Sequence, residues 1–106
     1  MLVRHIYDAN DDKRFHEKIL FDQSVTESAT LSRHTVKPGK NTQTALHMDR
    51  EEFCVIIKGR ALLTVANELQ EVRPGDVAYI PRNTRHQLAC ISDEDLEFLC
   101  FANHLK

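Results

Sequence analysis

From Ala29 to its end, the chain alternates short apolar segments with turn residues. The segments are rich in β-branched and aromatic side chains, and Pro38-Gly39, Pro74-Gly75 and Pro81 lie between them. Segments of this length between such turns are typical of β-strands. The pattern predicts strands at residues 30–36, 52–57, 61–65, 69–72, 77–80, 86–91 and 96–102. Strands this short and closely spaced predict an all-β sandwich or barrel.

The first quarter of the chain has a weaker pattern. Residues 15–21 fit either a short helix or an edge strand, and the sequence leaves both open. We therefore treat residues 1–28 as an N-terminal extension that packs on the barrel or on a partner subunit, and residues 29–106 as the barrel itself. The run Asp49-Arg50-Glu51 is expected to be a solvated turn.

The segment that begins at Glu52 is apolar on both of its faces. With the period of two that a strand imposes, one face carries Glu52, Cys54 and Ile56, and the other carries Phe53, Val55 and Ile57. A strand of this kind in a small barrel needs cover on its outer face. We expect a second copy of the chain to provide it in a homodimer, and the alternative is cover by residues 1–28.

Length, charge and hydropathy argue against a nucleic-acid-binding protein and against a membrane-spanning segment. A chain of 106 residues is long enough for one domain, and its formal net charge of −2 gives no attraction to nucleic acid or to an anionic membrane. The apolar run 54–57 is too short to cross a bilayer. The N-terminus lacks the features of a secretory signal, and the 3 cysteines form no CxxC pair. We therefore expect a cytoplasmic protein with reduced thiols.

Three side chains beside predicted turns form a candidate metal site. His47 precedes one predicted strand, Glu52 begins that strand, and His86 begins another. Imidazole nitrogens and carboxylate oxygens are ligands that first-row divalent metals accept. Each residue also has a simpler interpretation on its own: an exposed turn residue, a solvated charge and a hydrogen-bonded core histidine.

The stretch from Gly39 to Gly59 resembles the first sequence motif of the cupin superfamily, G-x5-H-x-H-x3–4-E-x6-G. His47 stands at the second histidine position and Glu52 at the glutamate position. Ala45 stands where the family has its first histidine.

The second cupin motif, G-x5-P-x-G-x2-H-x3-N, resembles the stretch from Gly75 to Cys90. Pro81 and His86 are in register with it. Asn83 stands for the motif glycine and Cys90 for the motif asparagine.

The resemblance over residues 29–102 implies a small antiparallel jelly-roll β-barrel that holds a divalent metal ion inside one end and acts on a small molecule. Because Ala45 removes one family ligand, two interpretations remain open. His47, Glu52 and His86 can form the two-histidine, one-carboxylate set of non-haem Fe(II) dioxygenases. Mn, Ni or Zn would suit the same ligands, and an isomerase or lyase could use the ion as a Lewis acid. Otherwise the site is degenerate and the barrel binds a sugar-like ligand without catalysis.

Three further residues are candidates for the same cavity. His34 stands at a strand position where cupins commonly have an inward-pointing side chain. It could therefore replace the missing ligand or act in catalysis. Gln43 has the parity of Ala45 and carries an amide oxygen. Tyr79 precedes Pro81 and could donate a proton from its phenol. The simpler interpretation places each of these three side chains at the surface or at the barrel rim.

Overall fold

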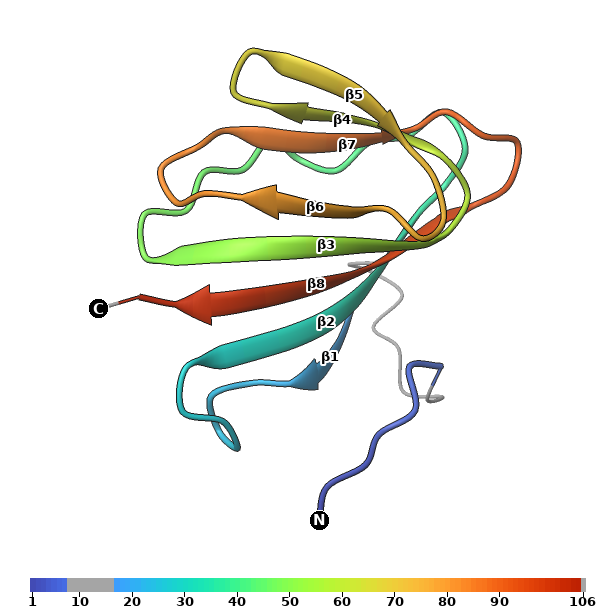
Figure 1. The fold of residues 1–106 in the computed structure, drawn as a ribbon. Helices are drawn as coiled ribbons and strands as arrows, with labels where there is room; N and C mark the ends of the chain where they lie inside the picture. The colour runs from blue at the N-terminus through green and yellow to red at the C-terminus, as the bar shows by residue number, and fades with distance from the viewer. Residues whose placement is uncertain (8–16, 106) are drawn as a thin grey trace.

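The computed structural model describes residues 1–7 and 17–105, which form two antiparallel sheets (Figure 1). One sheet has the strand order β1-β2-β8-β3-β6 and the other the order β5-β4-β7. The strands are β1 (Glu17–Phe21), β2 (Ala29–Val36), β3 (Arg50–Lys58), β4 (Ala61–Val65), β5 (Glu68–Val72), β6 (Val77–Ile80), β7 (His86–Cys90) and β8 (Leu96–His104). The all-β jelly-roll prediction is thus confirmed.

The alternation of side chains along the strands builds the core. In β8, Leu96, Phe98, Cys100 and Ala102 point inward, and in β3 the inward side chains are Glu52, Cys54 and Ile56. The two strands pair along most of their length, with Cys54 opposite Cys100 and Glu52 opposite Ala102. A carboxylate is therefore placed on the buried face of the sheet, where Glu52 is only 8% exposed.

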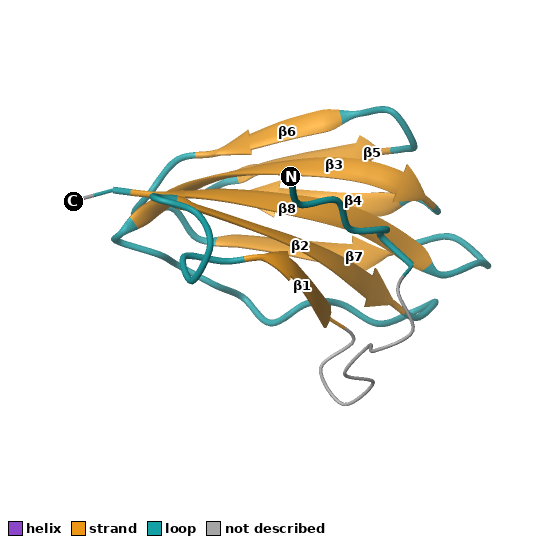
Figure 2. Ribbon diagram, turned by 90° about the horizontal axis from the view of Figure 1, so that it is seen from below, coloured by secondary structure: helices purple, strands orange, loops and turns teal. Residues whose placement is uncertain are grey.

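The weak pattern at residues 15–21 is resolved as an edge strand from Glu17 onward, whereas residues 15 and 16 lie outside the described part of the chain. β1 pairs with β2 and buries Leu20 at 2% exposure. Residues 1–7 lie across the outer face of β2, where Arg33 Nε donates a hydrogen bond to the Ile6 carbonyl at 2.5 Å. Figure 2 shows this segment running over the strands. No membrane-spanning helix is found among the described residues.

The predicted turn at Asp49-Arg50-Glu51 is wrong in part. Arg50 and Glu51 are the first residues of β3, and they pair with His104 and Asn103 of β8. The pairing extends both strands beyond their apolar stretches, because hydrogen bonds to a neighbouring strand do not depend on side-chain polarity.

Gly59 joins β3 to β4 at a point where no side chain fits. Its φ is +77°, and a Cβ added there would lie 2.5 Å from the Asp95 carbonyl oxygen. Gly75 also has a positive φ, +93°, but an added Cβ would meet nothing within 4 Å.

We predict that Gly59→Ala destabilises the fold far more than Gly75→Ala does. Both substitutions strain the backbone by about 1–2 kcal/mol, and only the first also forces β8 to move. Urea unfolding of the two variants would show a loss for Gly59→Ala at least twice that for Gly75→Ala. Equal losses would mean that the approach to Asp95 is not a constraint.

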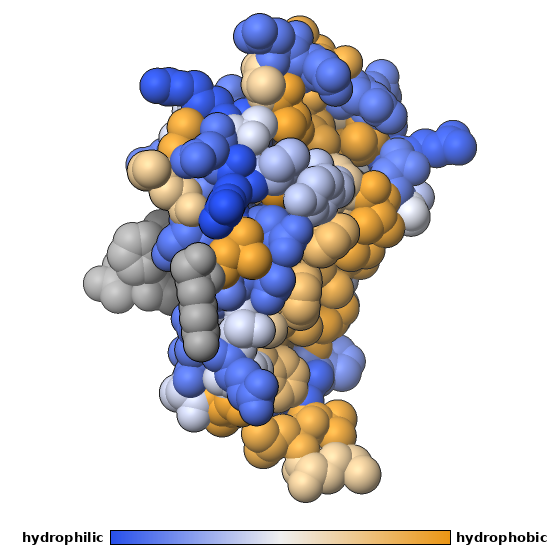
Figure 3. Space-filling model, turned by 60° about the vertical axis from the view of Figure 1, so that its left-hand side comes forward, coloured by the Kyte–Doolittle hydropathy of each residue, from blue (hydrophilic) through white to orange (hydrophobic). Residues whose placement is uncertain are grey.

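The outer face of the larger sheet carries a row of exposed aromatic side chains. Phe53 of β3 lies opposite Tyr79 of β6 and Phe101 of β8, with ring centroids 5.2 and 6.3 Å away. The three residues are 37%, 51% and 39% exposed. Hydrophobic residues gather in a band along one side of the surface in Figure 3. An apolar row of this kind is typical of an interaction surface.

The homodimer expected from the apolar outer face of Phe53, Val55 and Ile57 stays a prediction, and the aromatic row extends that face to the neighbouring strands. Phe53→Lys would place a charge in the middle of the row and should convert a dimer to monomers in sedimentation velocity. Leu69→Lys is the matched control, since Leu69 is 65% exposed on the other sheet. A wild-type chain that sediments as a monomer at micromolar concentration would contradict the expectation.

Candidate metal centre

Backbone hydrogen bonds bring His47 and His86 to the same end of the molecule. Ala45 and His86 exchange N–H···O bonds of 3.0 and 2.9 Å in an isolated bridge. The carbonyl of His47 accepts a hydrogen bond of 2.7 Å from the backbone N–H of Asn83, which has a φ of +60°. The segment that carries His47 is therefore fixed against the turn that leads into β7.

Glu52 supplies the carboxylate from the first part of β3. Its Oε1 lies 3.5 Å from His47 Nε2 and 3.6 Å from His86 Nε2. One ligand atom from each of the three residues lies within 4.8 Å of the others. The three residues predicted from the sequence are thus brought together, and they form one group that can hold a metal ion.

The His86 imidazole is oriented to bind a metal ion through Nε2. His86 Nδ1 lies 3.1 Å from the Thr84 carbonyl oxygen. A carbonyl can only accept, so Nδ1 carries the proton and Nε2 keeps its lone pair. Burial lowers the pKa of His47, although the neighbouring Glu52 carboxylate acts in the opposite direction. A lowered pKa favours the neutral imidazole that a metal ion requires.

The two distances from the Glu52 oxygen fit a first-row divalent ion. Two ligands at about 2.1 Å from one ion lie about 3.4 Å apart at a tetrahedral angle. The distances from Glu52 Oε1 to the two imidazole nitrogens, 3.5 and 3.6 Å, are close to this value. The donor set of two nitrogens and one oxygen suits Fe(II), Mn(II), Ni(II) or Zn(II).

The second oxygen of Glu52 faces a thiol. Cys100 Sγ donates a hydrogen bond of 2.8 Å to Glu52 Oε2. A hydrogen bond with Cys54 and burial together raise the pKa of Cys100, so the sulfur keeps its proton. Sequence reasoning missed this contact. Its signal is the parity of β8, which points Cys100 to the same face as the inward residues of β3.

The three residues border a cavity of about 330 Å³. His34 and Gln43 also line it, but neither belongs to the metal-binding group of His47, Glu52 and His86. The His34 Nε2 is 2.8 Å from Ser32 Oγ, and its ring stacks on Phe98 with centroids 4.9 Å apart. Burial lowers the pKa of His34. Its role as ligand or catalytic residue stays a prediction, as does that of Gln43.

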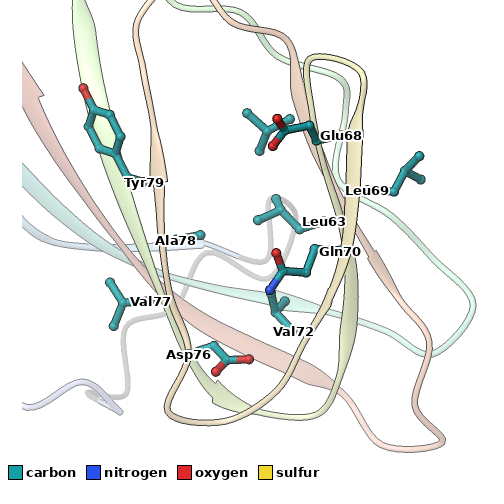
Figure 4. Close-up of a pocket in the computed structure, with 10 residues that line it drawn as sticks. Leu63, Glu68, Leu69, Gln70, Val72, Asp76, Val77, Ala78 and Tyr79 are labelled. Carbon is teal, nitrogen blue, oxygen red and sulfur yellow. The ribbon is translucent and has the colours of Figure 1, made fainter.

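Tyr79 does not line this cavity, although the predicted role as a proton donor requires it to do so. Glu52 pairs with Ile80, so the adjacent Tyr79 pairs with Phe53 and faces outward. The Tyr79 hydroxyl donates a 2.9 Å hydrogen bond to Glu51 Oε1. Tyr79 borders a second cavity, of about 570 Å³, beside β5 and β6, and its hydroxyl points away from the other labelled residues in Figure 4. A catalytic role for Tyr79 at the histidine and glutamate group therefore has no geometric support.

Arg50 is a cavity residue that sequence reasoning did not identify. It lines the same space as Glu52 and is held by Asp49, with Nε to Oδ1 at 3.0 Å. Strand parity could have identified Arg50 as a cavity residue, because it is two residues before Glu52 and so lies on the same face of the strand. Arg50 was missed because the predicted strand began at Glu52, whereas β3 begins at Arg50.

Comparisons with known proteins agree with this architecture. An uncharacterized protein of Methanocaldococcus jannaschii is 38% identical over 71 residues, which are 67% of this chain and 57% of that protein. A mannose-1-phosphate guanylyltransferase of Salmonella muenchen is 33% identical over 58 residues, 55% of this chain and 12% of the enzyme. The chain thus spans about half of the first relative and a small part of the second.

Two solved structures have the same fold. A predicted oxalate decarboxylase of Thermotoga maritima superposes with a TM-score of 0.79 at 21% identity, covering 84% of this chain and 79% of that one. A cupin 2 conserved barrel domain protein of Salinispora arenicola gives a TM-score of 0.78 at 24% identity, covering 96% and 87%. The cupin domain family matches residues 32–102 of the sequence. With these matches, two facing antiparallel sheets and a histidine and glutamate group at one end, the chain belongs to the cupin family.

Proposed function

We propose that this cupin is a metal-dependent enzyme that acts on a small polar molecule, with a dioxygenase-like activity as the first candidate. The observation that carries the proposal is the position of Glu52 Oε1, which lies within 3.6 Å of an imidazole nitrogen from each of two other segments. His47, Glu52 and His86 would hold the ion, with iron as the first candidate. Bound there, Fe(II) would supply open positions for a chelating substrate and for dioxygen.

The cavity supports a small substrate that carries both polar and apolar groups. Its volume of about 330 Å³ is at the lower end of small-molecule sites. The His34 imidazole and the Arg50 guanidinium lie in its wall together with hydroxyl groups of β2. These groups would bind and orient polar atoms of the substrate, while Leu88 and Phe98 would exclude water from one side.

A second candidate function follows from Ala45. This residue lines the cavity beside His86 and offers no donor atom. Held by the same three protein ligands, a redox-inert ion such as Zn(II) would act as a Lewis acid in an isomerase or lyase. Without an ion, the cavity would bind a sugar-like ligand without catalysis. The partial match to a mannose-1-phosphate guanylyltransferase supports a sugar-like ligand.

Metal titration tests the first proposal. The wild-type chain should bind one Fe(II) per chain without oxygen present and gain thermal stability from it, because an ion that binds only the native state stabilises it. Glu52→Gln and His86→Ala should each lose more than about a hundredfold in affinity, since even indirect supports of a ligand contribute up to that much. His5→Gln is the control for a histidine outside the site.

Equal stabilisation of the wild type and the two ligand variants would place the metal elsewhere. Dioxygen uptake by the Fe(II)-loaded chain with a panel of small hydroxylated and carboxylated compounds separates the two candidates. Uptake supports the dioxygenase. Ligand binding without uptake supports a lyase, an isomerase or a binding protein, which product analysis then distinguishes.

We also predict that metal affinity falls as the pH is lowered. Protons compete for an imidazole only below its pKa, and the pKa of His47 is lowered from its ordinary value of 6.5. The affinity for Mn(II) should therefore hold from pH 8 to about 6.5 and fall at lower pH. Calorimetric titration across pH 8 to 5 measures this. A flat profile over the range would contradict imidazole ligation.

We further propose a cytoplasmic location. Cys54, Cys90 and Cys100 are all free and buried. Free thiols in this number support a reducing compartment.

A further inference from the structure

The carboxylate of Glu52 has a different partner for each oxygen. Oε1 lies beside the two imidazole nitrogens, whereas Oε2 accepts a 2.8 Å hydrogen bond from Cys100 Sγ. The thiol thus contacts the carboxylate on the side opposite the imidazoles, where it can restrain the orientation of the carboxylate plane. A carboxylate without such a partner can rotate about its last side-chain bond, because that torsion is soft.

Cys100 is held at a fixed position in the sheet. It lies in β8, which is paired on both sides, and is opposite Ser32 of β2 and Cys54 of β3. It is 8% exposed and Cys54 is 3% exposed. A side chain on a central strand, surrounded by packed neighbours, holds its partner more precisely than a loop residue would.

We propose that Cys100 is a positioning residue that holds Glu52 in the orientation needed for metal binding. This inference rests on the proposed metal site. The thiol acts through Glu52 and does not touch the ion. Its contact also provides a partner for an oxygen that would otherwise be buried without one, since Glu52 is only 8% exposed.

The size of the effect follows from the type of donor. Partners that orient a metal ligand typically contribute tenfold to a hundredfold in metal affinity. A thiol is a weak donor, although the charge of the acceptor strengthens its bond. We therefore expect about a tenfold contribution.

Three substitutions of Cys100 test the proposal. Cys100→Ala and Cys100→Val both remove the donor, and valine also fills the space, so one of them remains informative if the other fails to fold. Cys100→Ser keeps a donor in place. Cys90→Ala is the matched control, because Cys90 is a free cysteine at 3% exposure on β7 and its sulfur contacts Ser92 and Glu94 instead.

Co(II) affinity, measured by competition with a chelator, is the first readout, and the visible absorption of bound Co(II) is the second because it reports coordination geometry. Cys100→Ala and Cys100→Val should bind Co(II) about tenfold more weakly than the wild type and give an altered spectrum. Cys100→Ser should recover most of the affinity. Cys90→Ala should lose thermal stability but keep the wild-type affinity and spectrum.

The outcomes separate this inference from the proposed function. If the wild type binds Co(II) and Glu52→Gln does not, but Cys100→Val matches the wild type in affinity and spectrum, the positioning role is wrong and the metal site stands. An equal loss in Cys90→Ala and Cys100→Ala would attribute the effect to general destabilisation and would also overturn the role. A wild-type chain that binds no Co(II) would overturn both proposals.

Discussion

A carboxylate on the buried face of a β-sheet is the constraint on which the rest of this site depends. A charged group removed from water is stable only when hydrogen bonds or opposite charges replace its solvation. Glu52 is 8% exposed. Its Oε2 accepts a hydrogen bond from Cys100 at the centre of β8, and its Oε1 lies within 3.6 Å of imidazole nitrogens from the loop before β3 and the start of β7, where the proposed ion would balance its charge. Among the described residues, every buried side-chain polar atom has a hydrogen-bond partner. The end of the cavity is thus organised around one side chain.

The sheet topology makes this convergence possible. β3 lies between β8 and β6 in the larger sheet, and β7 is an edge strand of the smaller one. The two sheets face each other, so a residue at the start of β3 can meet a residue at the start of β7 across the interior (Figure 1). The bridge between Ala45 and His86 then ties the connecting loop to the smaller sheet and completes the group.

Strand parity made it possible to predict from the sequence which side chains around Glu52 face the interior. The alternation around Glu52 placed Glu52, Cys54 and Ile56 on one face, and all three are buried. For Cys100 and Glu52, strand parity gives only the shared inner face. Their contact also depends on register, because it joins residues diagonal to each other on adjacent strands. The sequence left the position of Tyr79 open between the cavity and the barrel rim for a related reason. Its face depends on which residue of β3 it pairs with, and a short strand such as Val77–Ile80 is compatible with either register.

The hydrogen bonds between Ala45 and His86 use main-chain atoms alone, so they place no requirement on the side chain of residue 45. The scaffold at this corner is therefore independent of how many donors the protein contributes there. A single substitution, Ala45→His, could bring a fourth protein ligand to the ion while the loop keeps its path. For the metal site proposed above, the number of protein ligands thus depends on one side chain and not on the path of the backbone.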